Sequence, residues 1–336
     1  MHYVRFLSAP KVIKHRRGPL VQLVFTITTD LGDSFLFPER FLDLQVVAIA
    51  ASPEGSSTWL LSDPGHLDWE PGMRVAKPAL ELPVALERAL ESGMRVHVCV
   101  RASEPIHTAE SVPRILALSA EKMRYRKEAA EKGAVMPAWV PLTLKPSDTD
   151  VSIRRILLND TPEGLGTIEI EEEIGESIAR HVWDGGVVAT CALVGIETAP
   201  DSESSLNPCM MTMKNIFSRQ QAIRVLELGC GVVIHAANLT YFPRGEPFTT
   251  KVFLATKPRH ESEDVLYELM EKEGWYSVHK QILPKPVLGG TPQTIELHLF
   301  DKSGLSDGKG PGKWEARKYE EKDKKDEEDS EKSSED

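Results

Sequence analysis

The chain has 336 residues, of which 41% are hydrophobic and 27% charged, and its formal net charge is −11. This length allows one large domain or two ordinary ones, and the composition is typical of globular proteins. No apolar run approaches the roughly 20 residues of a membrane helix, and the first residues lack the apolar core of a signal peptide. Because phosphate contacts need a basic face, the negative charge disfavours nucleic-acid binding. We expect a monomeric protein of the cytoplasm, with the nucleus as a second location, and no membrane association.

The four cysteines are scattered along the chain and form no C-x-x-C pair: Cys99, Cys191, Cys209 and Cys230. Zinc sites need closely spaced ligand pairs, and disulfide frameworks belong to small secreted domains. We therefore expect reduced thiols and no metal site.

The first 145 residues contain several β-branched, partly alternating runs separated by Gly, Pro and Asp turns, which predict strands. These runs are "LVQLVFTITT", "LQVVAIAA", "STWLLS" and "MRVHVCV". An amphipathic helix is predicted in "PALELPVALERALESG", ending at Gly93, and a second one in the basic segment that ends at Gly133. Residues 1–145 are therefore predicted to form a β-rich module with helices.

The Pro-rich segment "MPAWVPLTLKPSDTD" is predicted as a connector, and residues 146–165 as a linker. After it, "TIEIEEEIG" alternates like a strand, and "ESIARHVWDGGVVATCALVG" has helical apolar spacing interrupted at Gly185 and Gly186. Residues 201–215 are predicted as a polar surface loop. Residues 303–336 combine dense mixed charge with no apolar periodicity, which predicts a disordered acidic tail.

Three strand-like runs follow the predicted loop: "VLEL", "VVIHAA" and "KVFLAT". A helix is predicted in "SEDVLYELMEKEGW", with Ser262 as its cap and Val265, Leu266, Leu269 and Met270 on one face. The segments "WYSVHKQI" and "TIELHLF" are predicted as an antiparallel pair joined by a loop.

The run "VLELGCG" is an apolar strand that enters a glycine turn. Glycines let the backbone approach a ligand closely, and Glu227 can accept hydrogen bonds from a cofactor's amine or hydroxyl groups. A dinucleotide site would need a third glycine opening a helix, whereas Gly229 and Gly231 are followed by a strand-like run. We therefore reject an NAD-dependent oxidoreductase.

Several of these segments, in this order, resemble the family 16 protein methyltransferases over roughly residues 166–300. They are "IEIEEEIGESIARHVWDGGVVAT", "RVLELGCG", "AANLTY" and "KVFLATKPRHESEDVLYELMEKEGW". The resemblance implies an α/β, Rossmann-like class I methyltransferase domain at 166–302, preceded by the β-rich module, as in fungal-type members. It also implies S-adenosyl-L-methionine as cofactor and a protein substrate, such as a chaperone or a translation factor, methylated on lysine.

By the same resemblance, five residues belong to the cofactor site. Trp183 and Asp184 of "VWDGG" would lie beside the cofactor at the substrate entrance. Glu227, Gly229 and Gly231 would hold its methionine portion. Residues 257–261, which follow "KVFLAT", fit either substrate contacts or a charged turn.

The catalytic signature of the family, D/E-x-x-Y, falls on residues 238–241, where Tyr241 matches and Asn238 replaces the acid. A carboxylate at this position can orient a lysine amine, which must be uncharged to attack a methyl group. Asparagine keeps a carbonyl acceptor but loses the charge. We expect Asn238 to weaken catalysis more than cofactor binding.

The spacing of the strands is too short for a complete cofactor sheet. In the resembling fold "VLEL" and "VVIHAA" are parallel neighbours, which need a crossover of a dozen or more residues. Only residues 229–231 intervene. Three residues reach about 10 Å, whereas a five-residue strand is roughly 17 Å long. Segments of the sheet are therefore missing, which argues against a complete cofactor pocket and full activity.

Two explanations of the missing segments compete. Coding segments were dropped by a gene-model error or by splicing, or the chain is a degenerate paralogue. We favour the first, because drift would also have eroded the well-formed strands and the helix that remain. Two functions stay open: a lysine methyltransferase, or a non-enzymatic protein-binding module formed by the front strands and the basic helix.

Overall fold

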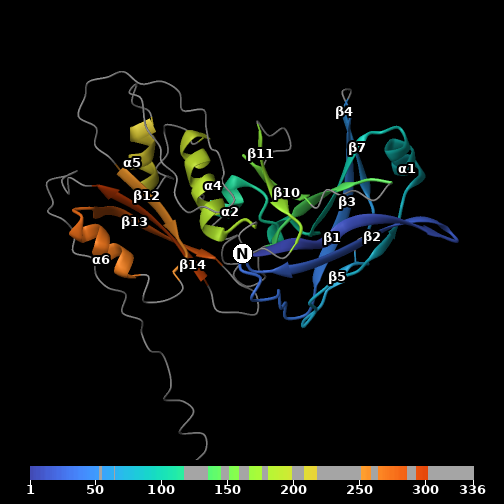
Figure 1. The fold of residues 1–336 in the computed structure, drawn as a ribbon, viewed down its shortest axis with the longest axis horizontal. Helices are drawn as coiled ribbons and strands as arrows, with labels where there is room; N and C mark the ends of the chain where they lie inside the picture. The colour runs from blue at the N-terminus through green and yellow to red at the C-terminus, as the bar shows by residue number, and fades with distance from the viewer. Residues whose placement is uncertain are drawn as a thin grey trace, which may run out of the picture.

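The computed structural model describes residues 1–52, 55–63, 65–116, 135–144, 151–158, 166–175, 181–198, 208–217, 251–258, 264–285 and 293–301. These residues form a strand-rich front unit, up to residue 175, and a rear unit in which helices cover a small sheet (Figure 1). The start of the chain lies where the two units meet (Figure 1).

Two sheets make up the front unit. One has the order β6-β2-β1-β8, and the other has the order β11-β10-β9-β7-β3-β4, with β5 on β3. The strands are β1 (His2–His15), β2 (Gly18–Thr28), β3 (Leu42–Ser52), β4 (Gly55–Leu60), β5 (Asp68–Trp69), β6 (Ala79–Glu81), β7 (Arg95–Ala102), β8 (Val135–Met136), β9 (Ala138–Leu142), β10 (Val151–Leu157) and β11 (Thr167–Glu173). The strands predicted from the four β-branched runs are confirmed as β2, β3, β4 and β7.

The core of the front unit follows from the period-two alternation of its strands. Leu23, Phe25 and Ile27 on one face of β2 are fully buried. Phe25 stacks on Trp69, with ring centroids 6.4 Å apart. Burial of each such side chain contributes about 1.5–3 kcal/mol to stability. Hydrophobic burial between the sheets therefore holds this unit together.

Where the structure describes them, the helices of the front unit agree with those predicted from the sequence. Helix α1 (Val84–Glu91) ends before Gly93, whose φ of 80° is the left-handed conformation that terminates helices. A short 3-10 turn, η1 (Pro105–His107), precedes α2 (Val112–Leu116), the start of the second predicted helix. The rest of that prediction, through Gly133, lies outside the described residues.

The predicted connector and linker contain strands instead. β9 pairs with β7, and β10 pairs with β11 along its whole length, from Val151↔Glu173 to Leu157↔Thr167. β10 lies inside the predicted linker, and β11 was assigned to the rear domain, yet both extend the front sheet. The apolar alternation of β10 is hidden because Ser152 and Arg154 are polar but buried.

A three-stranded sheet of order β12-β14-β13, with both pairings antiparallel, is the centre of the rear unit. Its elements are α4 (Asp184–Thr198), α5 (Pro208–Phe217), β12 (Lys251–Thr256), α6 (Asp264–Lys272), β13 (Tyr276–Lys285) and β14 (Gln293–Asp301). The strand "KVFLAT", the helix after it and the antiparallel pair are thereby confirmed. The mixed α/β class also agrees with the prediction.

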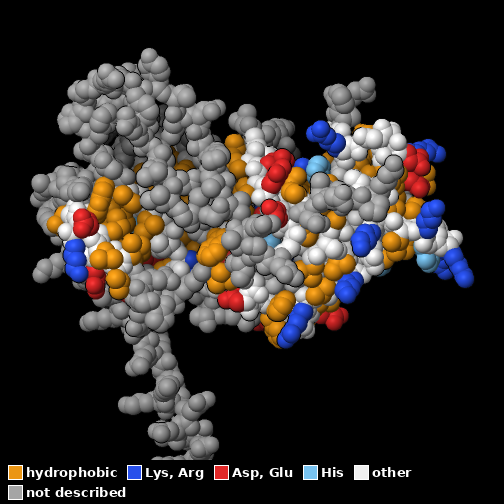
Figure 2. All heavy atoms as spheres, in the orientation of Figure 1, with side chains coloured by type: hydrophobic (Ala, Val, Ile, Leu, Met, Phe, Trp, Pro, Cys, Tyr) orange, Lys and Arg blue, Asp and Glu red, His pale blue; other side chains and the backbone are white. Residues whose placement is uncertain are grey.

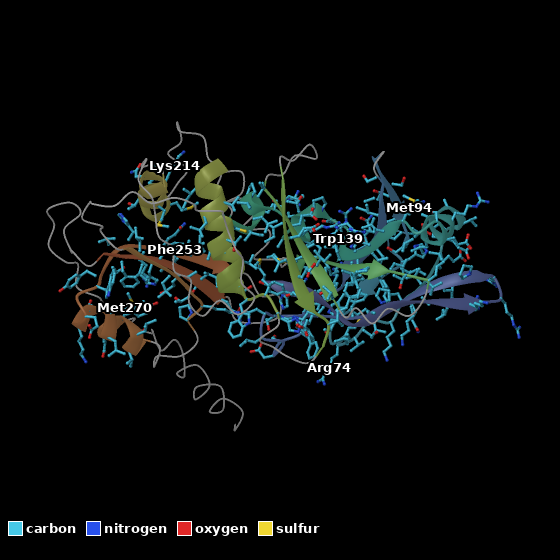
Figure 3. All side chains as sticks on the ribbon, turned by 45° about the horizontal axis from the view of Figure 1, so that its top comes forward. Arg74, Met94, Trp139, Lys214, Phe253 and Met270 are labelled. Carbon is cyan, nitrogen blue, oxygen red and sulfur yellow. The ribbon has the colours of Figure 1, made fainter. Side chains whose placement is uncertain are left out.

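Helices lie on both sides of this sheet, with α4 and α5 on one side and α6 on the other (Figure 1). Figure 3 labels a residue of each layer: Lys214 on α5, Phe253 on the sheet and Met270 on α6. On β14, Ile295, Leu297 and Leu299 are buried in the cluster that includes α4 and α5. The alternate residues Glu296 and His298 are also buried.

Two predictions around α4 were wrong. Gly185 and Gly186 do not interrupt the helix but lie in its first turn. At Gly185 an added Cβ would approach the carbonyl oxygen of Ala255 to 3.3 Å, so this glycine permits close packing of α4 on β12. The predicted loop at 201–215 contains most of α5, which starts with Pro208 and buries Met210 and Met213 three residues apart.

Only Met270 of the predicted apolar face of α6 is partly buried. Val265, Leu266 and Leu269 are exposed, and Tyr267 is the buried residue of this helix. Hydrophobic side chains are visible at this end of the molecule (Figure 2). The helix was therefore predicted correctly, but the face that it buries was not. Tyr267 is buried because its hydroxyl contacts His298 of β14. The cap Ser262 lies outside the described residues.

Candidate functional site

Two segments that resemble the methyltransferases meet in space. Asp184 of "VWDGG" is the first residue of α4, and Lys257 follows β12 directly. The Lys257 ammonium donates to Oδ2 of Asp184 at 3.1 Å. The two residues are 73 positions apart in the sequence. The fold therefore brings these two segments into direct contact.

The front unit completes this contact into an ionic cluster. The Lys257 ammonium also donates to Oδ1 of Asp30 at 2.6 Å, and the backbone N–H of Asp184 donates to Oδ2 of Asp30 at 3.3 Å. The Tyr3 hydroxyl donates to Oδ1 of Asp184 at 2.5 Å, and the ammonium of Met1 lies 3.5 Å from its Oδ2. All these groups are buried. Asp30, Lys257 and Asp184 thus form a closed ring between the two units.

The charges of this cluster fix the protonation states of its members. Burial alone would raise the pKa of Asp184, but the Met1 and Lys257 ammonium groups and the hydrogen bonds from Tyr3 and Lys257 outweigh it and lower the pKa to about 2. Burial, and then the negative charge of Asp184, raise the pKa of Tyr3 well above its ordinary value. At neutral pH, Asp184 is therefore a carboxylate and Tyr3 a neutral donor.

A second buried ion pair holds the backbone just before this site. Arg154 Nε donates to Oε2 of Glu172 at 2.7 Å, and Oε1 of Glu172 accepts the N–H of Val182 at 2.7 Å. Arg154 also donates to the carbonyl oxygens of Met136 and Pro137. Because Val182 precedes Trp183, strand β11 fixes the entry to "VWDGG", and Asp30 fixes its first helical residue.

The tyrosine ring links the two ion pairs. The Arg154 guanidinium carbon lies 5.5 Å from the centroid of the Tyr3 ring, and that of Arg5 lies 5.8 Å from it. Arg5 in turn donates to the carbonyl oxygens of Thr29 and Asp30. Guanidinium groups at this distance attract an aromatic ring electrostatically. Tyr3 therefore contacts both clusters: its ring packs against Arg5 and Arg154, and its hydroxyl donates to Asp184.

Two of the predicted site residues lie in this region. Trp183 is partly exposed, and its carbonyl oxygen accepts the N–H of Val187 at 3.0 Å. The carboxylate of Asp184 is fully buried and turned to protein donors. The other five, Glu227, Gly229, Gly231, Asn238 and Tyr241, lie outside the described residues, so their placement stays a prediction.

Sequence reasoning missed the part of the site that comes from the front unit. Neither Asp30 nor Tyr3 was predicted as a site residue, and β1, which carries Tyr3, was not predicted as a strand. Lys257 was given two roles, a substrate contact or a charged turn, and the structure pairs it with two carboxylates. The one local signal was a buried-strand sequence ending in an acid at Asp30.

A second polar cluster lies in the rear unit. The hydroxyl of Tyr267 lies 3.2 Å from Oγ1 of Thr256 and 3.2 Å from Nε2 of His298. The same imidazole nitrogen lies 3.0 Å from Oε2 of Glu296, which also pairs with Lys280 at 3.2 Å. This chain of hydrogen bonds connects α6 to β12, β13 and β14. Its role in the structure is to attach α6 through polar contacts.

Among the described residues, no group of three His, Cys, Asp or Glu side chains is arranged to hold a metal ion. In the same part of the chain, no helix combines the length and apolarity needed to cross a membrane. The thiols of Cys99 and Cys191 are buried, and burial raises the pKa of Cys99.

Comparison with known proteins gives one match. Residues 165–246 match a family model described as lysine methyltransferase. The matched range begins just before β11 and includes Trp183, Asp184, the sequence "VLELGCG" and residues 238–241. No curated protein and no solved structure matches the chain.

Proposed function

We propose that the chain is an S-adenosylmethionine-dependent protein lysine methyltransferase of the Rossmann-like type, with an incomplete cofactor sheet and, for that reason, low activity. The observation that supports this most is the match of residues 165–246 to the lysine methyltransferase family model. The contact between Asp184 and Lys257 also supports the proposal. Lys257 lies outside the matched range, but its segment resembles the same family, and the fold places it against the matched segment. A sheet with helices on both sides is also the layer architecture of an α/β domain. The proposed substrate is a cytoplasmic protein such as a chaperone or a translation factor.

The described residues fit this cofactor in part. The carboxylate of Asp184 does not fit direct contact, because it is fully buried and accepts hydrogen bonds from Tyr3 and Lys257. We assign it a positioning role: it fixes the first turn of α4, next to the partly exposed Trp183. Glu227, Gly229 and Gly231 would hold the cofactor, whose sulfonium supplies an electrophilic methyl group.

The acceptor lysine would meet residues 238–241. Tyr241 can donate a hydrogen bond, and the Asn238 carbonyl can accept one from the amine. Without the family's carboxylate the amine loses an anionic partner near the methyl group. The rate of methyl transfer should therefore be lower than that of a family member with an acid here, at similar cofactor affinity.

A second candidate function is that of a non-enzymatic protein-binding module. The three-residue connection at 229–231 favours it, because so short a link cannot join parallel neighbouring strands. In this case the front unit binds a partner, and the rear unit does not hold the cofactor.

Ultraviolet cross-linking of the full chain to S-adenosylmethionine with a radiolabelled methyl group tests the location of the site. Peptide mapping should find the label within residues 181–258, and Glu227→Gln should reduce it at least tenfold. Glu91→Gln, on the exposed end of α1, is the matched control and should label like the wild type. A folded chain that takes no label supports the second candidate and contradicts the first.

A further inference from the structure

The loop between β2 and β3 exposes three of the ten phenylalanines of the chain. Phe35, Phe37 and Phe41 have 37%, 52% and 57% of their surface exposed. We call these three residues the aromatic loop. Exposed aromatic side chains at such density on one short segment are typical of binding surfaces.

The aromatic loop is held in place by buried contacts. Leu36, between two of the phenylalanines, is fully buried. Its N–H donates to the carbonyl of Ile27 at 2.9 Å, and its carbonyl accepts the indole N–H of the buried Trp69 at 2.8 Å. Phe35 and Phe37 therefore point outward because Leu36 points inward. A surface held in this way loses little conformational entropy on binding.

Two arginines lie next to phenylalanines of the aromatic loop. The Arg74 guanidinium carbon lies 5.6 Å from the centroid of the Phe35 ring, and the Arg74 carbonyl accepts a hydrogen bond from Thr26 at 2.7 Å. Arg74 lies at the lower edge of the front unit in Figure 3. Arg40, also exposed, precedes Phe41. Phenylalanine and arginine are both enriched at protein–protein interfaces.

The aromatic loop begins close to the ionic cluster. Phe35 is bridged to Thr28, and Thr28 lies two residues before Asp30, which binds Lys257. Bridged residues are about 5 Å apart, and two extended residues span about 7 Å. The first phenylalanine thus lies roughly 10 Å from the junction that positions α4. A protein bound to the aromatic loop therefore lies near the junction, although the buried cluster itself stays out of its reach.

We propose that the aromatic loop and Arg74 form the docking surface for the protein substrate. The segment that docks carries an apolar or aromatic side chain for the phenylalanines and an acidic residue for Arg74, close to the target lysine. This inference rests on the proposed function for the identity of the partner. The docking itself does not require the cofactor.

The test is a phage-displayed library of 16-residue peptides with a central lysine, selected on the full chain without cofactor. Selected peptides should carry an apolar or aromatic residue and an acid near the lysine. The best peptide, labelled with fluorescein, should bind Phe37→Ser at least tenfold more weakly than the wild type in fluorescence anisotropy. Val84→Ser, also exposed but on α1, is the control and should bind within twofold of the wild type. Circular dichroism checks that both variants fold.

Selection of no peptide, or equal binding by Phe37→Ser, overturns the docking proposal. The outcome is separable from that of the proposed function, because S-adenosylmethionine binding is measured independently. If the chain binds cofactor and Phe37→Ser leaves its peptide affinity unchanged, the docking surface alone is refuted. If Phe37→Ser weakens peptide binding but the chain binds no cofactor, the docking surface is supported and the methyltransferase function is refuted.

Discussion

The side-chain nitrogen of Lys257 lies 2.6 Å from a carboxylate oxygen of Asp30, 227 residues away in the sequence. This contact joins the rear unit to the front unit, and it is buried on both sides. Asp184, at the start of α4, shares the same lysine. The front unit is therefore part of the structure that positions the segment resembling the methyltransferases.

Substitution of Lys257 by methionine should destabilise the fold by about 3–5 kcal/mol. The substitution keeps the length of the side chain but leaves two buried carboxylates, Asp30 and Asp184, without their shared cation. Urea unfolding measures the loss. Lys77→Met, at an exposed position, is the control and should change stability by no more than about 0.5 kcal/mol. Equal unfolding midpoints for the two variants would show that the buried ring is unimportant for stability.

Removal of the Tyr3 hydroxyl should cost about 1–3 kcal/mol, because the buried carboxylate of Asp184 loses a donor. Tyr3→Phe keeps the ring between the two arginines and so isolates the hydroxyl. In an Asp184→Asn background the same change should cost less, and a double-mutant cycle measures that coupling. Tyr276→Phe, on a partly exposed tyrosine of β13, is the control. A coupling energy near zero would refute the assigned hydrogen bond.

Stability should fall when the pH is lowered from about 6.5 towards 3, because of His2. Burial, and then the ammonium of Met1, lower the pKa of His2 to about 3 from its ordinary 6.5. Neither ring nitrogen has a hydrogen-bond partner among the described residues. In this window the unfolded chain binds a proton that the folded chain does not, so acid favours unfolding. The lowered pKa of Asp184 adds a further loss only below its ordinary 3.8, down to about 2.

The melting temperature at pH 7, 5.5 and 4.5 measures this effect. His2→Leu should flatten the decrease, because leucine has no proton to gain. His15→Leu, on an exposed histidine at the end of β1, should leave the slope as in the wild type. Parallel slopes for wild type and His2→Leu would exclude His2 as the cause.

The two neighbouring glycines of α4 should respond differently to alanine. At Gly186 an added Cβ meets nothing within 4 Å, so Gly186→Ala should stabilise the fold, by less than the roughly 0.5–1 kcal/mol expected in a helix interior because Gly186 lies in the first turn. At Gly185 it meets the Ala255 carbonyl oxygen at 3.3 Å, which should cancel that gain or reverse it. Thermal unfolding of both variants makes the comparison. A larger gain at Gly185 would contradict the close packing of α4 on β12.

Local patterns were sufficient to predict strands such as β2, β3 and β7, since β-branched residues and alternation are typical of a half-buried surface. They missed β1, the longest of the described strands. They failed for β10, where Arg154 is buried because Glu172 on the neighbouring strand neutralises it. They also failed for the face of α6, where Tyr267 points inward to His298. In both cases a polar residue is buried because a distant partner satisfies it, and no local pattern contains that partner.

The same limit applies to the site. The sequence predicted Asp184 as a site residue from "VWDGG", and the structure adds the partners that come from the front unit, Tyr3 and Asp30. The contact with Lys257 links residues far apart in the sequence, so only the fold creates it. Glu227, Gly229, Gly231, Asn238 and Tyr241 remain predictions from resemblance.

Isothermal titration of the full chain with S-adenosylmethionine tests the central claim most directly. A lysine methyltransferase predicts saturable binding with a micromolar dissociation constant, reduced at least tenfold by Glu227→Gln and unchanged by Glu91→Gln. No detectable heat of binding at millimolar cofactor, from a chain whose thermal unfolding is cooperative, would contradict it.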